Sequence, residues 1–130
     1  MKKVLFVCVH NAGRSQMAEA FFNQMAQGKV EATSAGTRPA ARTDKGVVEA
    51  MREEGIDIRH QKPKALTIEM MEDADRVISM GCGVEETCPA SFVPIENWEI
   101  DDPEGKSPED VRKIRDEIKV RVAALLKELG

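Results

Sequence analysis

Cys8, Arg14 and Ser15 form the pattern cysteine, five residues, arginine, serine near the start of the chain. An apolar run over 4–9 leads into this segment and a helical pattern leaves it, so the segment joins a strand to a helix. Such a loop directs successive backbone N–H groups and a helix N-terminus at one point, which favours an anion. We therefore predict that a tetrahedral oxyanion binds to Val9, His10, Asn11, Ala12, Gly13, Arg14 and Ser15.

The side chains of this loop suit nucleophilic chemistry at an oxyanion. Arg14 can donate two parallel hydrogen bonds to the anion, which lysine does less well. Asn11 and Gly13 tolerate the positive φ angles that a tight loop requires. The field of the loop favours the thiolate form of Cys8, which is the nucleophilic form of cysteine, and Ser15 can donate a hydrogen bond to that sulfur.

A second segment combines two cysteines with backbone freedom. Gly81 and Gly83 flank Cys82, and Cys88 follows six residues later. In a helix these cysteines would lie about 9 Å apart along the axis, whereas a disulfide needs Cα atoms within roughly 7 Å. The segment is therefore predicted to change shape when the two thiols pair, and the alternative is that both are unrelated buried thiols.

The sequence gives less support to the other uses of three cysteines, a structural disulfide framework or a metal site. The apolar run over 4–9 is too short for a signal peptide, and no segment approaches the ~18 apolar residues of a membrane span. We therefore expect a cytoplasmic protein without membrane contact, in which a structural disulfide framework is not expected. His60 lies far from the other candidate ligands, so no zinc or other metal is predicted. His10 is expected to be a polar loop residue.

Length and charge limit the partners. A chain of 130 residues is predicted to form one domain over 1–130, and a monomer is expected. The net charge of −4 argues against a broad nucleic-acid-binding face, because phosphate contacts require clustered lysine and arginine. An anion must therefore be held locally, by a few groups inside a site.

The chain alternates between strand-like and helix-like patterns. This alternation predicts a single α/β domain with a parallel sheet and helices on both faces. Ligands bind beyond the carboxyl ends of such strands, and Cys8, Cys82 and Asp102 each come at or just after a predicted strand. The predicted strands are 4–9, 30–35, 76–80 and an edge strand at 92–95, and the predicted helices are 15–27, 44–54, 67–74 and 108–129, the last with Ser107 as its N-cap.

The loop at Cys8, the helix continuation over 16–20 and the strand end over 34–37 resemble the low-molecular-weight protein tyrosine phosphatase superfamily. The resemblance covers nearly the whole chain. It implies a flavodoxin-like, four-stranded parallel sheet, with Cys8 as the nucleophile and Arg14 as the oxyanion clamp. It also implies that Asp102, which directly precedes a proline, is the general acid, while Asp101 is expected to be solvated.

Two features favour the reductase branch of this superfamily. The residues 104–106 after the Asp-Pro pair are not aromatic and the chain has no tyrosine, whereas phosphatases of this group usually hold the substrate ring between aromatic residues. The cysteine pair is similar to that of thioredoxin-coupled arsenate reductases. Many relatives carry a cysteine at the position of Gly13, so its absence leaves Cys82 as the candidate partner of Cys8.

The resemblance to these reductases implies a mechanism and its partners. Arsenate, with phosphate as a competing oxyanion, would react at Cys8, and a disulfide relay would run from Cys8 through Cys82 to Cys88. An external thiol reductant of the thioredoxin type would regenerate the enzyme, with no bound cofactor, in a role in arsenic detoxification. Some relatives hold a potassium ion with a Thr and an Asp, but Gln61 and Pro63 occupy those positions here, so no ion is predicted.

Two other functions stay open at this point. One is a phosphatase that hydrolyses phosphate esters through a phospho-enzyme on Cys8, with Cys82 and Cys88 incidental. The other is a non-catalytic oxyanion-binding protein or thiol-switch regulator on the same scaffold, in which Asp102 has no role.

Overall fold

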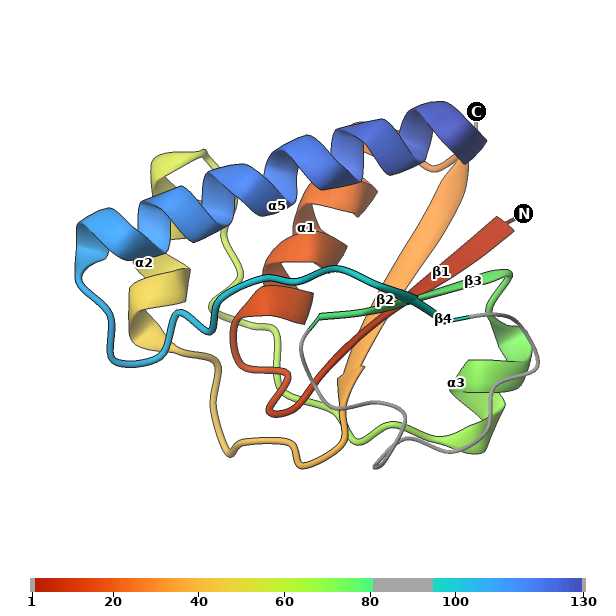
Figure 1. The fold of residues 1–130 in the computed structure, drawn as a ribbon, viewed down its shortest axis with the longest axis horizontal. Helices are drawn as coiled ribbons and strands as arrows, with labels where there is room; N and C mark the ends of the chain where they lie inside the picture. Colours follow the sequence, from red (N-terminus) through yellow and green to blue (C-terminus); the bar gives the residue numbers. More distant parts are fainter. Residues whose placement is uncertain (1, 81–94, 130) are drawn as a thin grey trace.

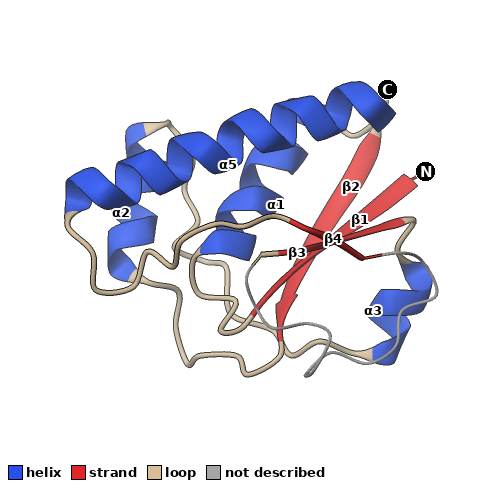
Figure 2. Ribbon diagram, viewed as in Figure 1, coloured by secondary structure: helices blue, strands red, loops and turns tan. Residues whose placement is uncertain are grey.

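The strand β1, Lys2–Cys8, lies inside a four-stranded sheet (Figure 2). The computed structural model describes residues 2–80 and 95–129. β1 pairs in parallel with β2, Val30–Gly36, on one side and with β3, Arg76–Ser79, on the other. The short strand β4, Ile95–Asn97, pairs in parallel with β3, which gives the order β2-β1-β3-β4. This order is of the flavodoxin-like type, so the predicted fold class is confirmed.

The unbroken apolar sequence of β1 is explained by burial on both faces. Val4, Phe6 and Cys8 join one hydrophobic cluster, while Leu5 and Val7 join a second cluster on the opposite face. A central parallel strand has helices on both sides, so neither face can be polar.

Four helices in the described part of the chain cover the two faces of the sheet (Figure 1). α1, Arg14–Ala26, α2, Lys45–Glu53, and α5, Pro108–Leu129, pack on one face. The short helix α3, Ile68–Asp73, packs on the other face against β1. The predicted helices on both sides of the sheet are therefore confirmed, with bounds that differ by at most one residue at each end.

Three helices begin at side chains that cap them. Asp44 accepts from the N–H of Gly46 at 2.8 Å, and Thr67 accepts from the N–H of Met70 at 3.1 Å. The predicted N-cap Ser107 accepts from the N–H of Asp110 at 3.2 Å. Each cap satisfies a donor that has no partner inside its helix.

The edge strand differs from its prediction over 92–95. The observed strand covers Ile95–Asn97, and residues 92–94 lie outside the described residues. An apolar pattern cannot identify Glu96 and Asn97 as strand residues. A strand at the sheet edge is paired on one side only and tolerates exposed polar side chains, and Glu96 forms an ion pair with Arg76 at 2.9 Å.

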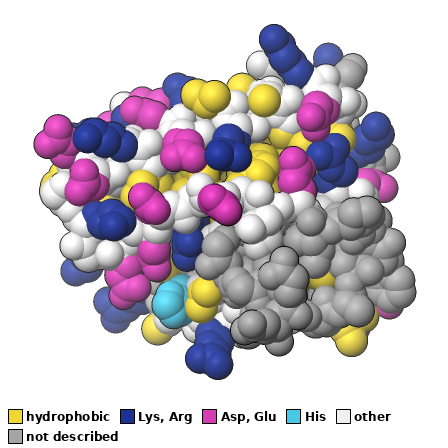
Figure 3. Space-filling view, in the orientation of Figure 1, with side chains coloured by type: hydrophobic (Ala, Val, Ile, Leu, Met, Phe, Trp, Pro, Cys, Tyr) yellow, Lys and Arg dark blue, Asp and Glu magenta, His cyan; other side chains and the backbone are white. Residues whose placement is uncertain are grey.

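Charges of both signs alternate over the face shown in Figure 3. Along α5 in particular, dark blue and magenta side chains lie next to one another, which fits a solvent-facing helix side held by ion pairs. Among the described residues, no helix combines the length and the apolar character that crossing a membrane requires.

Glu53 joins α2 to α5 through two arginines. Its carboxylate lies 2.9 Å from Arg112 and 2.9 Å from Arg115, and Arg115 also donates to the carbonyl of Ala50 at 2.9 Å. The guanidinium of Arg115 is buried, so these partners replace its water. Hydrogen bonds from Arg112 and Arg115 lower the pKa of Glu53 from its ordinary 4.5 to about 2.

We expect Glu53→Gln to reduce thermal stability in a pH-dependent way. A lowered folded-state pKa means that the ionised carboxylate stabilises the fold fully above pH 4.5, and that this contribution is lost as the pH falls towards about 2. The melting temperature of the variant, measured by circular dichroism, should lie below wild type at pH 6, and the gap should close towards pH 2. A gap that stays constant would contradict this assignment.

Asp57→Asn is a matched control for that change. The pKa of Asp57 is also lowered to about 2, chiefly by its hydrogen bond from the side chain of Arg59 two residues away. Such a local pair can form in the unfolded chain too, so its loss should change the melting temperature less.

Candidate active site

The loop from Cys8 to Gly13 is held by its carbonyl groups, all of which accept hydrogen bonds from outside the loop. Four of them accept from backbone N–H groups of the segment 37–44, which connects β2 to α2. The other two accept from the first turn of α1. The bonds are Thr37 to Cys8 (3.2 Å), Arg38 to Val9 (2.8 Å), Ala40 to His10 (2.9 Å), Gln16 Nε2 to Asn11 (3.1 Å), Asp44 to Ala12 (2.8 Å) and Met17 to Gly13 (2.9 Å).

The N–H groups at the end of the same loop remain available to a ligand. The N–H of Asn11 donates to Cys8 Sγ at 3.2 Å. The N–H groups of residues 12–15 donate no hydrogen bond to an acceptor within 2–80 and 95–129, and Gly13, the N-cap of α1, offers no side-chain cap. An anion is the natural partner of such a cluster of donors.

Asn11 adopts φ of 51°, so the predicted positive φ at this position is confirmed. Its Oδ1 accepts from the N–H of Lys64 at 2.9 Å, which fixes the orientation of the amide. Its Nδ2 then donates to Ser15 Oγ at 2.6 Å. Ser15 Oγ lies 2.9 Å from Cys8 Sγ, and because its oxygen accepts from Asn11, its own hydrogen is available to Cys8. Ser15 is therefore placed to donate to the sulfur.

Gly13 differs from its prediction, because its φ is −142° and not positive. The reason for glycine is close packing. A Cβ atom at this position would lie 2.9 Å from Pro103 Cγ and 3.3 Å from Val47 Cγ2. Gly13 thus lets the loop that carries Asp102 approach the anion-binding loop over residues 8–15, which we call the cradle.

Gly36 is a site residue that sequence analysis treated only as the end of a strand. It pairs with Cys8 in the sheet, and a Cβ atom there would lie 2.6 Å from the carbonyl oxygen of Val9 and 3.0 Å from Asn11. Only its place beside the loop explains the glycine, and no local pattern reveals that contact.

Two glutamines behind the loop were also missed as supports. Gln16 Nε2 donates to Asn11 Oδ1 at 3.1 Å, and Gln61 Nε2 donates to Gln16 Oε1 and, at 3.2 Å, to Glu19 Oε2. Gln16 is fully buried in the first turn of α1. A buried polar residue at a helix start beside a cysteine loop is a usable signal for such a network.

Arg14 and Asp102 meet above the cradle. Arg14 is 7% exposed, and its Nη1 donates to the carbonyl of Ile100 at 3.1 Å. Its Nη2 lies 3.7 Å from Asp102 Oδ2. The Asp102 side chain is 47% exposed and its Oδ1 accepts from the N–H of Glu104 at 3.0 Å, so the carboxyl group is oriented and still reaches solvent.

A cavity of about 250 Å³ lies between these groups. Its walls include the predicted residues Cys8, Arg14 and Asp102, and none of its lining residues within the described ranges is Phe, Tyr or Trp. The Val9 side chain packs with the cluster on the opposite face of the sheet, so Val9 offers only its backbone. Cys82 and Cys88 lie outside the described residues. The lining residues are Cys8, His10, Ala12, Gly13, Arg14, Ala40, Arg42, Asp44, Asp102, Pro103 and Glu104.

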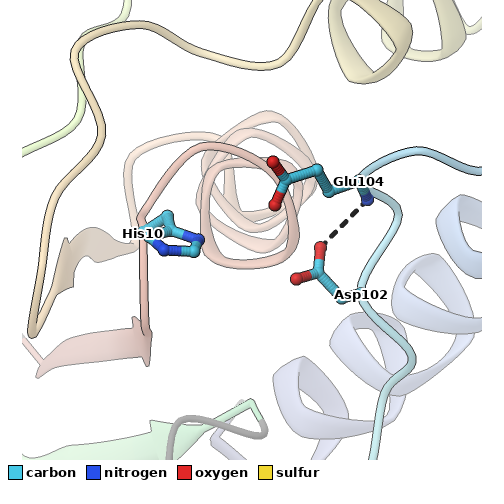
Figure 4. A group of neighbouring side chains, drawn as sticks. All are labelled: His10, Asp102 and Glu104. Carbon is cyan, nitrogen blue, oxygen red and sulfur yellow. Dashed lines mark hydrogen bonds between the residues drawn. The ribbon is translucent and has the colours of Figure 1, made fainter.

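His10, Asp102 and Glu104 converge at the mouth of the cavity (Figure 4). One ligand atom of each lies within 4.8 Å of the others, and all three side chains are exposed. These atoms could reach one cation, but the guanidinium of Arg14 at 3.7 Å from Asp102 opposes a second positive charge there. Glu104 could not be identified from the sequence, because its place depends on the turn in which its N–H donates to Asp102.

The chain matches the family model of the low molecular weight phosphotyrosine protein phosphatase over residues 3–130. It is 39% identical over 134 residues to the glutaredoxin arsenate reductase of Synechocystis, covering 100% of both chains.

Two solved structures are similar over nearly the whole chain. One is the thioredoxin-dependent arsenate reductase of Corynebacterium glutamicum, with 39% identity and a TM-score of 0.85. The match covers 98% of this chain and 61% of that one. The other is an arginine phosphatase from Geobacillus stearothermophilus, with 27% identity, a TM-score of 0.88 and coverage of 99% and 93%.

We expect Ser15→Ala to slow the alkylation of Cys8 by iodoacetamide about tenfold at neutral pH, because a hydrogen bond to a charged group is worth ~1.5 kcal/mol. Peptide mass spectrometry would follow Cys8 separately from the other cysteines. Ser34→Ala is the control, since Ser34 is equally buried but donates to Glu19 at 3.0 Å. Equal rates in the two variants would mean that Ser15 does not stabilise the thiolate.

Proposed function

Because this chain belongs to the low-molecular-weight phosphotyrosine protein phosphatase family, we propose that it uses the family's cysteine loop to reduce arsenate to arsenite. The observation that carries the proposal is the size and lining of the pocket. A cavity of about 250 Å³ with no Phe, Tyr or Trp among its described lining residues suits a small inorganic oxyanion better than a phosphotyrosine ring. Relatives and solved structures named arsenate reductases support the same reaction.

The first step takes place in the cradle. Arsenate accepts hydrogen bonds from the free N–H groups after Cys8 and from Arg14. The Cys8 thiolate then attacks arsenic and forms a sulfur–arsenic bond, while one oxygen leaves. Asp102 protonates that oxygen, which departs as water. The exposed side of the Asp102 carboxyl group lets it regain a proton from solvent.

The second step moves two electrons from the protein to arsenic. The Cys82 thiolate attacks Cys8 Sγ, the sulfur–arsenic bond breaks with its electron pair on arsenic, and arsenite leaves. The Cys88 thiolate then attacks Cys82, which frees Cys8 as a thiolate and forms a Cys82–Cys88 disulfide. Cys82 and Cys88 are assigned these roles from the sequence, because both lie outside the described residues.

An external thiol reductant completes the cycle. Relatives of this chain are named for glutaredoxin and for thioredoxin, so a thiol-based donor is the common feature. We propose a thioredoxin-type donor that reduces the Cys82–Cys88 disulfide, with no bound cofactor and no metal. We further propose that residues 1–130 act as one catalytic domain, as a monomer in the cytoplasm.

A phosphatase is the second candidate, and a specific observation favours it. The arginine phosphatase has a fold as similar as that of the reductase, and Cys8, Arg14 and Asp102 are the groups that hydrolysis of a phosphate ester through Cys8 needs. Water would then attack the phospho-enzyme in place of Cys82. A non-catalytic regulator is less well supported, because it gives the Arg14–Asp102 contact at the cavity no function.

Single cysteine variants separate these functions. We expect Cys8→Ser to abolish both arsenite production with a thioredoxin system and hydrolysis of a chromogenic phosphate ester. Cys82→Ser and Cys88→Ser should stop repeated arsenate reduction because the relay is broken, yet leave slow ester hydrolysis. Wild-type arsenite production by Cys88→Ser over many turnovers would exclude the relay, and a wild type that only hydrolyses the ester would favour the phosphatase.

Asp102→Asn tests the general acid. We expect the rate of ester hydrolysis to fall about 100-fold or more, the typical contribution of general acid catalysis, with the larger loss for esters whose leaving group is a stronger base. Asp101→Asn is the matched control, since Asp101 is exposed and is not among the cavity-lining residues. Comparable losses in both variants would point to a general effect of charge rather than to proton transfer.

A further inference from the structure

A second hollow adjoins the reaction pocket. It has a volume of about 650 Å³ and lies between the segment that precedes α2, the first turns of α2 and the segment that follows it. Arg42 lines both hollows and therefore stands at their junction. Thr43 Oγ1 donates to the carbonyl of Gln61 at 2.8 Å, which ties the two segments together. The lining residues are Ala41, Arg42, Thr43, Lys45, Val48, Glu49, Arg59, Gln61 and Lys62, and we refer to this hollow as the outer groove.

The outer groove carries unbalanced positive charge. Its one carboxylate, Glu49, forms an ion pair with Arg52 at 3.5 Å, and Arg59 pairs with Asp57 at 2.9 Å. Arg42, Lys45 and Lys62 are exposed and have no acidic partner within the described ranges. Three positively charged side chains without an ion-pair partner in that part of the chain thus gather on one hollow, although the net charge of the chain is −4.

The rest of the pocket mouth has the opposite sign. Asp102 and Glu104 line the cavity and face His10 (Figure 4), and Asp44 lines it next to Arg42 and Lys45 of the outer groove. The Asp44 carboxylate is engaged by the N–H groups of Gly46 and Val47, whereas the Glu104 side chain is exposed. A dianion that approaches over Asp102 and Glu104 is repelled, so the side of Arg42 is the electrostatically open approach.

We propose that the outer groove is a second anion-binding site, in which Arg42, Lys45 and Lys62 attract a tetrahedral oxyanion and pass it to the cradle at Cys8. Clefts lined by one sign of charge concentrate ions of the other sign and raise association rates. The proposal rests on the proposed function only in taking Cys8 as the group that receives the anion. It applies to arsenate and to phosphate alike.

The test compares two alkylating reagents at Cys8, anionic iodoacetate and neutral iodoacetamide. The ratio of their rates reports the attraction of an anion to Cys8 and cancels changes in the reactivity of the thiolate. Peptide mass spectrometry would measure the ratio for Cys8 alone. We expect it to fall about threefold in Arg42→Gln and in Lys62→Gln at ~10 mM ionic strength, and the differences to vanish near 1 M salt, where the Debye length is about 3 Å.

Lys29→Gln is the matched control. It removes the same charge from an exposed lysine that precedes β2, at the opposite end of that strand from Gly36. Its ratio should equal that of wild type. A drop as large in Lys29→Gln as in Lys62→Gln, or no drop in either groove variant, would overturn the outer site.

The steady-state kinetics supply a separate readout. With arsenate, Lys62→Gln should lower kcat/KM and leave kcat unchanged, since Lys62 acts before the oxyanion reaches Cys8. The alkylation ratio needs no turnover, so a chain that fails to reduce arsenate but shows the expected ratios would contradict the proposed function and leave the outer site intact. Normal arsenate reduction with unchanged ratios would support the proposed function and contradict the outer site.

Discussion

The site depends on one constraint, which is that every carbonyl group from Cys8 to Gly13 is bonded from outside the loop. A buried carbonyl needs a partner, and here the segment 37–44 and the start of α1 supply all of them. With its acceptors turned to the scaffold, the loop has only donors to offer to the cavity. The cradle is therefore formed before any anion arrives, and an anion that binds does not have to reorganise it. Preorganised donors of this kind stabilise developing negative charge at low cost.

The sheet makes that arrangement possible. Parallel pairing places Cys8 opposite Gly36, so the chain that leaves β2 runs directly beside the loop that leaves β1. The missing side chain at Gly36 allows this contact, and the missing side chain at Gly13 allows the Asp102 loop to approach from the other side. Two glycines at which a Cβ atom would clash thus bring three separate segments within reach of one sulfur.

Local patterns in the sequence were sufficient for part of this picture. The doubly buried β1, the cap at Ser107 and the loop that joins β1 to α1 each follow from neighbouring residues, and the structure confirms them. Contacts between distant segments could not be predicted in this way. The steric role of Gly13 depends on Pro103, 90 positions later, and the place of Arg42 on the cavity depends on how 37–44 follows the loop. The predicted position of β4, 92–95, was wrong because an edge strand can carry polar residues such as Glu96, which an apolar pattern does not reveal.

The same cradle serves a reductase and a phosphatase because their first step is the same. Both need a thiolate, a clamp for the oxyanion and an acid for the departing oxygen, and Cys8, Arg14 and Asp102 surround one cavity. The reactions separate only when the adduct on Cys8 is resolved. Attack by water on the bound atom releases an anion of unchanged oxidation state, whereas attack by a thiol on Cys8 Sγ leaves an electron pair on arsenic. Cys8 is buried, with 2% of the residue exposed, so access to its sulfur decides the chemistry. A chain with this cradle becomes a reductase by bringing a second thiol to that sulfur, without any change in the groups that bind the oxyanion.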